Sequence, residues 1–472
     1  ISLYKGIIYI IVKELYDYNM QSVKDLVKLS PLLFIGFLLL FNRPFVGISI
    51  LGFRIGELII AGGLFFSFVI FFIFLLFPKY LNYFESFSSK VFFLVIVFSF
   101  IVSLYVKNTD PFNVYTYRIS SYIWTTAYLF LGAFLINNQD ILRKYKTLLL
   151  PSFLFVPFAH YLMSTGYYPD FIIRFFNQFS DKFEFTKASD IMLSLLIANI
   201  LNYKLTISKY FKLSYLCVSA ALMAPLLLKM SRGSFLGLFI FFIVSIYYFR
   251  NYILENIKKS IYLLIVSAIF FLGSTYNING VDLSFNLNFS SEIIILDGTP
   301  EETSIKQNLK KIVRKDTQRN AFLSLYFEDG RLYSIDQTTN WRLDIWQDVL
   351  EDMNKKNMIL SGYGYNEILP VMTDPTAPGR LGRDGLNEHV HNYFVNIFAR
   401  GGILQFITFL LFHLSIVLYW NRKYLNYTIL IFILPILIAA SLDMSMEGVQ
   451  YPVVYYLFLG YLLSTQQKSK II

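Results

Sequence analysis

Long apolar runs set the strongest limit on what this chain can fold into. Residues 63–77 read GLFFSFVIFFIFLLF, and residues 232–249 read RGSFLGLFIFFIVSIYYF. Backbone polar groups in a bilayer must bond within their own segment, so such runs predict membrane-spanning helices. Charged residues make up only 15% of the chain, whereas soluble domains carry about 25%. The composition therefore excludes a water-soluble fold and predicts a lipid bilayer as partner.

Apolar segments recur along most of the chain and predict an all-α polytopic membrane protein with about twelve transmembrane helices. They fall at 31–50, 56–77, 91–106, 121–136, 147–164, 188–202, 213–229, 232–249, 260–274, 403–420, 427–441 and 450–465. Residues 1–30 predict an amphipathic helix lying at the membrane interface. We expect three parts: nine spans with this helix in 1–274, a large loop at 275–390, and three spans in 391–472.

The distribution of basic residues predicts how the chain is oriented. Short loops alternate between rich and poor in Lys and Arg, which predicts that both termini are cytoplasmic and that 275–390 lies in the periplasm. Basic cytoplasmic loops also explain the formal net charge of +10, so no nucleic-acid partner is expected. Cys217 is the only cysteine, which predicts neither a disulfide framework nor a cysteine metal site.

The loop at 275–390 is too long to be a simple connector and is expected to be functional. It holds twelve Lys and Arg residues against seventeen Asp and Glu residues. Thr303 to Tyr326 predicts a helix with a basic face. Asn340 to Lys355 predicts a second helix that the glycines of Ser361-Gly362-Tyr363-Gly364 end, and Asp374 to Gly385 predicts an irregular loop.

Arg232 stands with Gly233 at the outer start of a predicted span. A guanidinium there can anchor the helix by reaching the headgroups. It can also bind a carboxylate or phosphate through two hydrogen bonds at the mouth of a cavity. Both interpretations are open from the residues alone.

The second candidate is Trp341-Arg342-Leu343-Asp344-Ile345-Trp346 on the second loop helix. Arg342 and Trp346 are i and i+4 neighbours on one helix face. The simpler interpretation is an amphipathic helix whose tryptophans pack on the membrane. The functional one is a site for a sugar attached to a phosphate, with an aromatic plane for the ring and a guanidinium for the anion.

The third candidate is Glu388-His389-Val390-His391-Asn392, where the loop returns to the membrane. The chain has only four histidines, so two of them here is an uneven distribution. His389 and His391 could hold a metal ion, but this spacing with one Glu is a weak metal motif. The better use is a neutral imidazole that removes a proton from a hydroxyl group.

These residues resemble a known family. His391-Asn392, followed by nine residues and Gly402, is similar to the histidine motif of bacterial O-antigen ligases and O-antigen polymerases. Arg232-Gly233 resembles the family's Arg-Gly at the start of a span, and Arg342 with Trp346 and the glycines at 362 and 364 resembles its loop signature. The resemblance covers residues 190–465. Gln405 departs from the ligase pattern, which usually has Gly, Thr or Tyr there.

The resemblance implies a membrane glycosyltransferase of the GT-C type that inverts configuration and uses a polyprenyl-diphosphate donor. It would transfer the glycan of an undecaprenyl-diphosphate-linked donor, on the periplasmic face of the bacterial inner membrane, without a metal or other cofactor. His391, Arg232 and Arg342 are the expected catalytic residues. The expected substrate-binding residues are Asn392, His389, Trp346, Arg380 and Arg383, although for the two arginines a solvated mobile loop is equally open.

Several alternatives remain. The single large loop favours a ligase, whose acceptor is lipid A-core, over a polymerase, whose acceptor is a second lipid-linked glycan. A transporter or flippase also commonly has twelve spans, but it would place broken helices or charges near mid-membrane. A structural partner in polysaccharide export would leave His391 and both arginines without a role.

Overall fold

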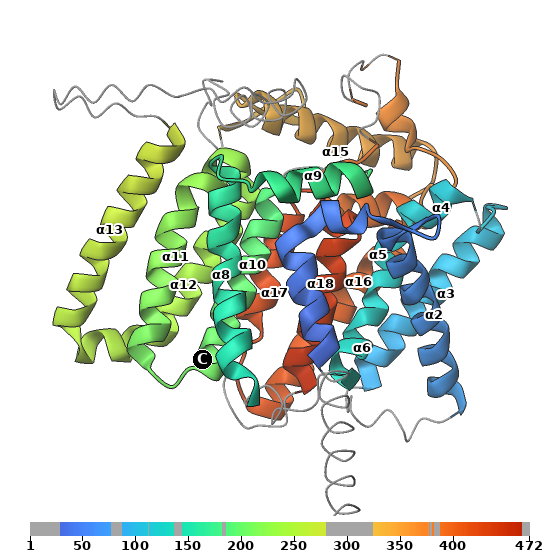
Figure 1. The fold of residues 1–472 in the computed structure, drawn as a ribbon. Helices are drawn as coiled ribbons and strands as arrows, with labels where there is room; N and C mark the ends of the chain where they lie inside the picture. Colours follow the sequence, from blue (N-terminus) through green and yellow to red (C-terminus); the bar gives the residue numbers. More distant parts are fainter. Residues whose placement is uncertain are drawn as a thin grey trace, which may run out of the picture.

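The computed structural model describes residues 29–76, 87–111, 113–135, 144–181, 186–279, 324–375, 377, 380–381 and 388–464. Its helices stand side by side, and a smaller layer lies across one end of them, which we call the site end (Figure 1). The predicted interfacial helix at 1–30 and the predicted basic helix at 303–326 lie almost entirely outside the described residues.

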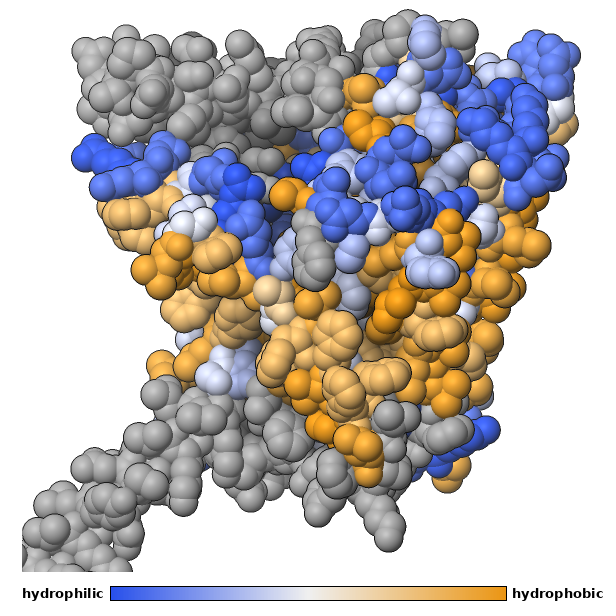
Figure 2. Space-filling view, turned by 90° about the vertical axis from the view of Figure 1, so that its right-hand side faces the viewer, coloured by the Kyte–Doolittle hydropathy of each residue, from blue (hydrophilic) through white to orange (hydrophobic). Residues whose placement is uncertain are grey.

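Eight helices within the described residues are long and apolar enough to cross a membrane, so the chain is a multi-pass membrane protein, as predicted. Each falls on a predicted span, while the count of twelve stays a prediction. Figure 2 shows hydrophobic residues over the middle of one face and hydrophilic residues gathered toward the site end. The eight are Leu29–Val46, α2 (Ile55–Leu76), α3 (Phe87–Val106), α8 (Lys146–Ser164), α11 (Lys209–Met230), α12 (Arg232–Glu255), α13 (Ile257–Asn279) and α16 (Tyr393–Tyr424).

The other four predicted spans coincide with shorter or more polar helices. The segment 121–136 is broken into α5 (Ser121–Trp124), η2 (Thr125–Ala127) and α6 (Tyr128–Leu135), and the others are α10 (Ala188–Leu205), α17 (Leu430–Ala440) and α18 (Gln450–Ser464). Every residue of α18 is buried, and so is α10 from its first residue to Tyr203. These helices are shielded by protein, so they need less apolar surface than a lipid-facing span.

Glycines allow α6 and α18 to cross closely at the centre of the bundle. A Cβ added at Gly132 would overlap the carbonyl oxygen of Leu457, and one at Gly460 would overlap that of Leu129. Small residues permit this approach of two backbones inside a membrane.

The layer at the site end is built from α15 (Gln337–Lys355) and a hairpin of β3 (Leu325–Glu328) and β4 (Arg331–Ser334). The strands pair antiparallel. The turn residues Asp329 and Gly330 both have positive φ, which suits a two-residue hairpin turn. The predicted helix 303–326 is therefore wrong in its last residues, since 325 and 326 lie in β3. The same end carries α4 (Val114–Ile119), α9 (Asp170–Phe179), β1 (Ser49–Ile50), β2 (Phe53–Arg54), η3 (Pro370–Thr373) and η4 (Ser445–Glu447).

The second loop helix is confirmed, and it starts three residues earlier than predicted. Asp336 is its N-cap, and the side chain accepts a hydrogen bond of 2.9 Å from the backbone N–H of Thr339. Carboxylates at this position satisfy unpaired N–H groups at the start of a helix. The helix ends at Lys355, before the glycines that were expected to end it.

Those glycines instead contact a break in α16. Gly402 has φ +70° inside this helix, and a Cβ there would overlap the carbonyl oxygen of Leu360. The loop pairs with the break through Gly364 N–H to Arg400 O at 3.0 Å and Ile403 N–H to Ile359 O at 2.8 Å. The glycine of the histidine motif therefore fixes where the loop seats on α16.

Candidate active site

The segment 388–392 leads into α16, and each of its residues has a different partner. Glu388 forms an ion pair with Arg118. His389 Nδ1 lies 2.5 Å from a carboxylate oxygen of Glu447, which is buried. The carbonyl oxygen of Val390 accepts a 2.7 Å hydrogen bond from the indole N–H of Trp346. The segment is thus held by elements distant in sequence.

The last two residues of this segment set the start of α16. The ring of His391 packs edge-on against Trp341, with centroids 5.3 Å apart, and its backbone has φ +54°. Asn392 is the N-cap, and its side-chain oxygen accepts hydrogen bonds from the N–H groups of Phe394 and Val395. The two tryptophans of α15 therefore contact this segment, while the interpretation in which they pack on the membrane stays untested.

Arg232, the first residue of α12, connects the spans to the layer above them. Its guanidinium forms two contacts with the carboxylate of Asp336, at 2.7 and 2.8 Å. Both side chains are largely buried. Because Asp336 also caps α15, the ion pair holds Arg232 at the layer, and simple headgroup anchoring does not describe its position.

Arg342 reaches from α15 to the segment between α17 and η4. Its Nη1 donates a 2.5 Å hydrogen bond to the carbonyl oxygen of Leu442. Its Nε is buried and has no hydrogen-bond acceptor among the described residues. Burial lowers the pKa of Arg342 and Arg232 lowers it further, while Asp443 and Asp336 act in the opposite direction. A buried N–H that lacks an acceptor is a donor available to an anion.

Each of the three predicted catalytic residues at the site end interacts electrostatically with at least one of the other two. Burial lowers the pKa of His391 to about 3, and the charges of Arg342, His389 and Lys187 lower it in the same direction. The charge of Arg232 in turn lowers the pKa of Arg342. At neutral pH the His391 imidazole is therefore uncharged and can accept a proton or a hydrogen bond.

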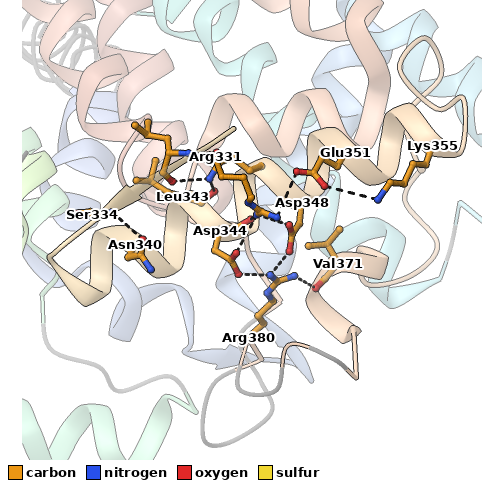
Figure 3. A network of polar contacts seen from close by, with 12 residues as sticks. Arg331, Ser334, Asn340, Leu343, Asp344, Asp348, Glu351, Lys355, Val371 and Arg380 are labelled. Carbon is orange, nitrogen blue, oxygen red and sulfur yellow. Dashed lines mark hydrogen bonds and ion pairs between the residues drawn. The ribbon is translucent and has the colours of Figure 1, made fainter. Parts of the chain in front are cut away.

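Arg380 is buried in an ion-pair network beside α15 (Figure 3). It contacts the carboxylates of Asp344 and Asp348 and donates a 3.0 Å hydrogen bond to the carbonyl oxygen of Val371. Arg331 on β4 pairs with the same two carboxylates. The interpretation of Arg380 as part of a solvated loop is wrong. Its substrate-binding role stays a prediction, while Arg383 lies outside the described residues.

The three side chains of the weak metal motif have different neighbours in the structure. Glu388 pairs with Arg118, His389 contacts Glu447, and the ring of His391 packs against Trp341. The expectation that no metal ion binds here stays a prediction.

The sequence analysis did not predict the contacts of Glu447, Arg400 and Gln405. Arg400 is buried on α16 and donates to the carbonyl oxygens of Gly364 and Glu367 and to the Tyr115 hydroxyl. The Gln405 side-chain oxygen accepts hydrogen bonds from Tyr365 at 2.5 Å and Tyr122 at 3.2 Å. The signals were an Arg just before the predicted span 403–420 and a Gln inside it, because polar residues in an apolar span need partners.

The fold and the site together define a multi-pass membrane protein that gathers two arginines and a histidine at one end of its helices. Residues 216–410 match the family model described as O-Antigen ligase, Wzy_C. This region contains Arg232, Arg342 and His391, and the match confirms the resemblance to the O-antigen ligase and polymerase superfamily. A search of curated proteins finds no significant match.

Proposed function

We propose that this protein is an O-antigen ligase-like glycosyltransferase. It would move a glycan from undecaprenyl diphosphate to a saccharide hydroxyl of lipid A-core at the periplasmic face of the inner membrane. The observation that carries this proposal is the grouping of Arg232, Arg342 and His391 at the site end, within the residues that match the O-antigen ligase family.

The two arginines suit a diphosphate leaving group. The acceptor oxygen attacks the anomeric carbon from the face opposite the diphosphate, and the bond between that carbon and the diphosphate oxygen breaks with inversion. Negative charge then develops on the diphosphate, where fixed cations in a partly dry site stabilise it. Arg342 offers its buried Nε–H, and Arg232 offers a guanidinium already oriented by Asp336.

His391 suits the acceptor side of the same reaction. Its neutral imidazole accepts a hydrogen bond from the attacking hydroxyl, and the proton passes to it as the new bond forms. A pKa of about 3 makes it a weak base while the site lacks an anion. A bound diphosphate would offset the positive charge of Arg342 and so raise the basicity of the imidazole. Donor binding would thereby prepare the acceptor side.

The decisive experiment is product analysis with purified protein and polyprenyl-diphosphate glycan, with and without lipid A-core. Glycan-bearing core lipid is the expected product. Lengthened polyprenyl-linked chains without core lipid would instead identify a polymerase of the same superfamily. If folded protein transfers no glycan but moves the donor across vesicle membranes, the protein is a flippase and not an enzyme. Transfer that persists in excess EDTA is expected, because the scheme uses only side-chain cations.

Arg232→Lys tests the anion-binding role, because it keeps the positive charge but loses the paired N–H groups. We expect turnover to fall roughly ten- to a hundredfold, corresponding to about 1.5–3 kcal/mol for a lost charged hydrogen bond. Arg250→Lys is the matched control, since Arg250 lies near the opposite end of the same helix. Equal turnover in both variants would reduce Arg232 to a structural ion pair.

His391→Ala tests the acceptor role in the same assay. Transfer should fall by about 10²–10⁴-fold, the range for a positioned acid or base. Undiminished transfer by a correctly folded variant would remove His391 from the reaction.

A further inference from the structure

A second surface at the site end does not belong to the candidate active site. It consists of α9 with Ser180 and Asp181, and of residues 47–54, which contain the β1–β2 hairpin. We call this surface the collar. Its two parts are joined by a backbone bridge between Ile48 and Ser180 and by an ion pair between Arg54 and Asp181. Residues 47–54 directly follow the spanning helix Leu29–Val46, and α9 begins a short connection after α8.

The helix α9 lies crosswise over the ends of the spans (Figure 1). At 100° per residue its side chains divide into three arcs. Ile173 and Phe176 are buried, and Phe176 lies 5.4 Å from Phe41 of the first spanning helix. This arc fixes α9 to the protein.

The second arc is apolar but exposed. It carries Phe171, Phe175 and Phe179, which are 73%, 47% and 48% exposed. The third arc is polar and contains Asp170, Arg174, Asn177 and Gln178. A helix with one arc toward protein, one apolar and exposed, and one polar has the pattern of a helix lying at a membrane surface.

The hairpin continues the exposed apolar arc. Leu51 at its turn is 95% exposed, and Phe53 is 60% exposed. In water such a cluster would be costly, at roughly 25 cal/mol per Å² of apolar surface. Because both parts follow closely on lipid-facing spans, the collar is continuous with the surface that already contacts lipid.

We propose that the collar inserts into the bilayer at the level where headgroups meet acyl chains, with the phenylalanines of α9 and the hairpin turn in lipid. The polar arc faces water. This inference concerns the lipid surface as partner and does not rest on the proposed reaction. It sets the depth of the site end in the membrane.

The test uses single cysteines in full-length protein carrying Cys217→Ser, labelled with a nitroxide in phosphatidylethanolamine and phosphatidylglycerol vesicles. A nitroxide attached at Phe175→Cys should collide more often with oxygen, which concentrates in lipid, than with a water-soluble nickel chelate. Asn177→Cys on the polar arc is the matched control and should show the reverse ratio. A Phe175 label that favours the nickel chelate, or one shielded from both reagents as under a protein partner, would overturn the proposal.

A second measurement avoids the spin label. Lipids brominated near the headgroup should quench the added tryptophan fluorescence of Phe171→Trp, measured against the protein with its four native tryptophans. They should not quench the added fluorescence of Asn177→Trp. Equal quenching of both variants would also overturn the proposal.

Discussion

The segment 388–392 shows how single residues acquire their chemistry from distant partners. His391 is neutral because it is buried beside Arg342, while His389, two residues away, contacts a buried carboxylate. Two histidines that look equivalent in the sequence therefore differ in character. The carboxylate of Glu447 contacts Nδ1 and fixes the ring of His389, whereas burial and nearby cations oppose protonation of His391.

The pKa of His391 makes a prediction about stability. Its folded pKa of about 3 lies below the ordinary value of 6.5, so the unfolded chain binds more protons at this residue between those two pH values. Stability should therefore fall as pH decreases through that window. We expect the unfolding temperature in detergent to drop more from pH 7.5 to pH 5 in the wild type than in His391→Gln. Equal drops would contradict the lowered pKa.

The pair of His389 and Glu447 makes a second prediction at this scale. Both side chains are mostly buried, so their contact is weakly screened by water. In a double-mutant cycle with His389→Ala and Glu447→Ala, the two effects on unfolding free energy should be non-additive by about 1–3 kcal/mol. Strictly additive effects, measured by denaturant unfolding in detergent, would show that the two side chains do not interact.

At the scale of elements, the break in α16 depends on two glycines that face each other, one in the loop after α15 and one in α16. Gly362 and Gly402 both have positive φ, and each faces backbone of the other segment. This pairing seats the loop that follows α15 and so places α15 over the spans. Helix α15 then carries Trp341, Arg342 and Trp346 to the segment 388–392 and to Leu442.

Replacing Gly402 with Ala should therefore be severe. The new Cβ would overlap the Leu360 carbonyl oxygen and would also require a strained backbone. We expect loss of folded protein or a penalty of several kcal/mol, roughly at the extreme of single substitutions. Gly273→Ala is the control, because α13 has open space there. That change should be neutral or slightly stabilising. Comparable melting curves for the two variants would argue against the seating role of Gly402.

At the scale of the whole molecule, the orientation in the membrane follows from the predicted loop charges and awaits a direct test. In spheroplasts carrying Cys217→Ser, Lys355→Cys on α15 should react with a membrane-impermeant maleimide. Lys258→Cys, exposed near the start of α13, should react only after permeabilisation. The opposite labelling pattern would show that the protein has the inverted orientation, with the site end in the cytoplasm.

Much of the architecture could be predicted because hydrophobicity is a local property of each run. The segments at 56–77 and 232–249 correspond to α2 and α12 within a few residues. The hairpin at 325–334 could have been found from its Asp-Gly turn between alternating residues. The partners of Arg232, Arg380 and Glu447 could not, because each contact joins residues that no local pattern relates.

The contacts of the site also have a consequence for synthesis. Arg342 binds the carbonyl of Leu442, and His389 contacts Glu447, so two of the residues around the site come from the segment between α17 and α18. A ribosome makes that segment only after the preceding spans and the long loop. Arg342 and the segment 388–392 are thus made before Leu442 and Glu447, their partners in these contacts. The contacts can form only once the last helices have been inserted.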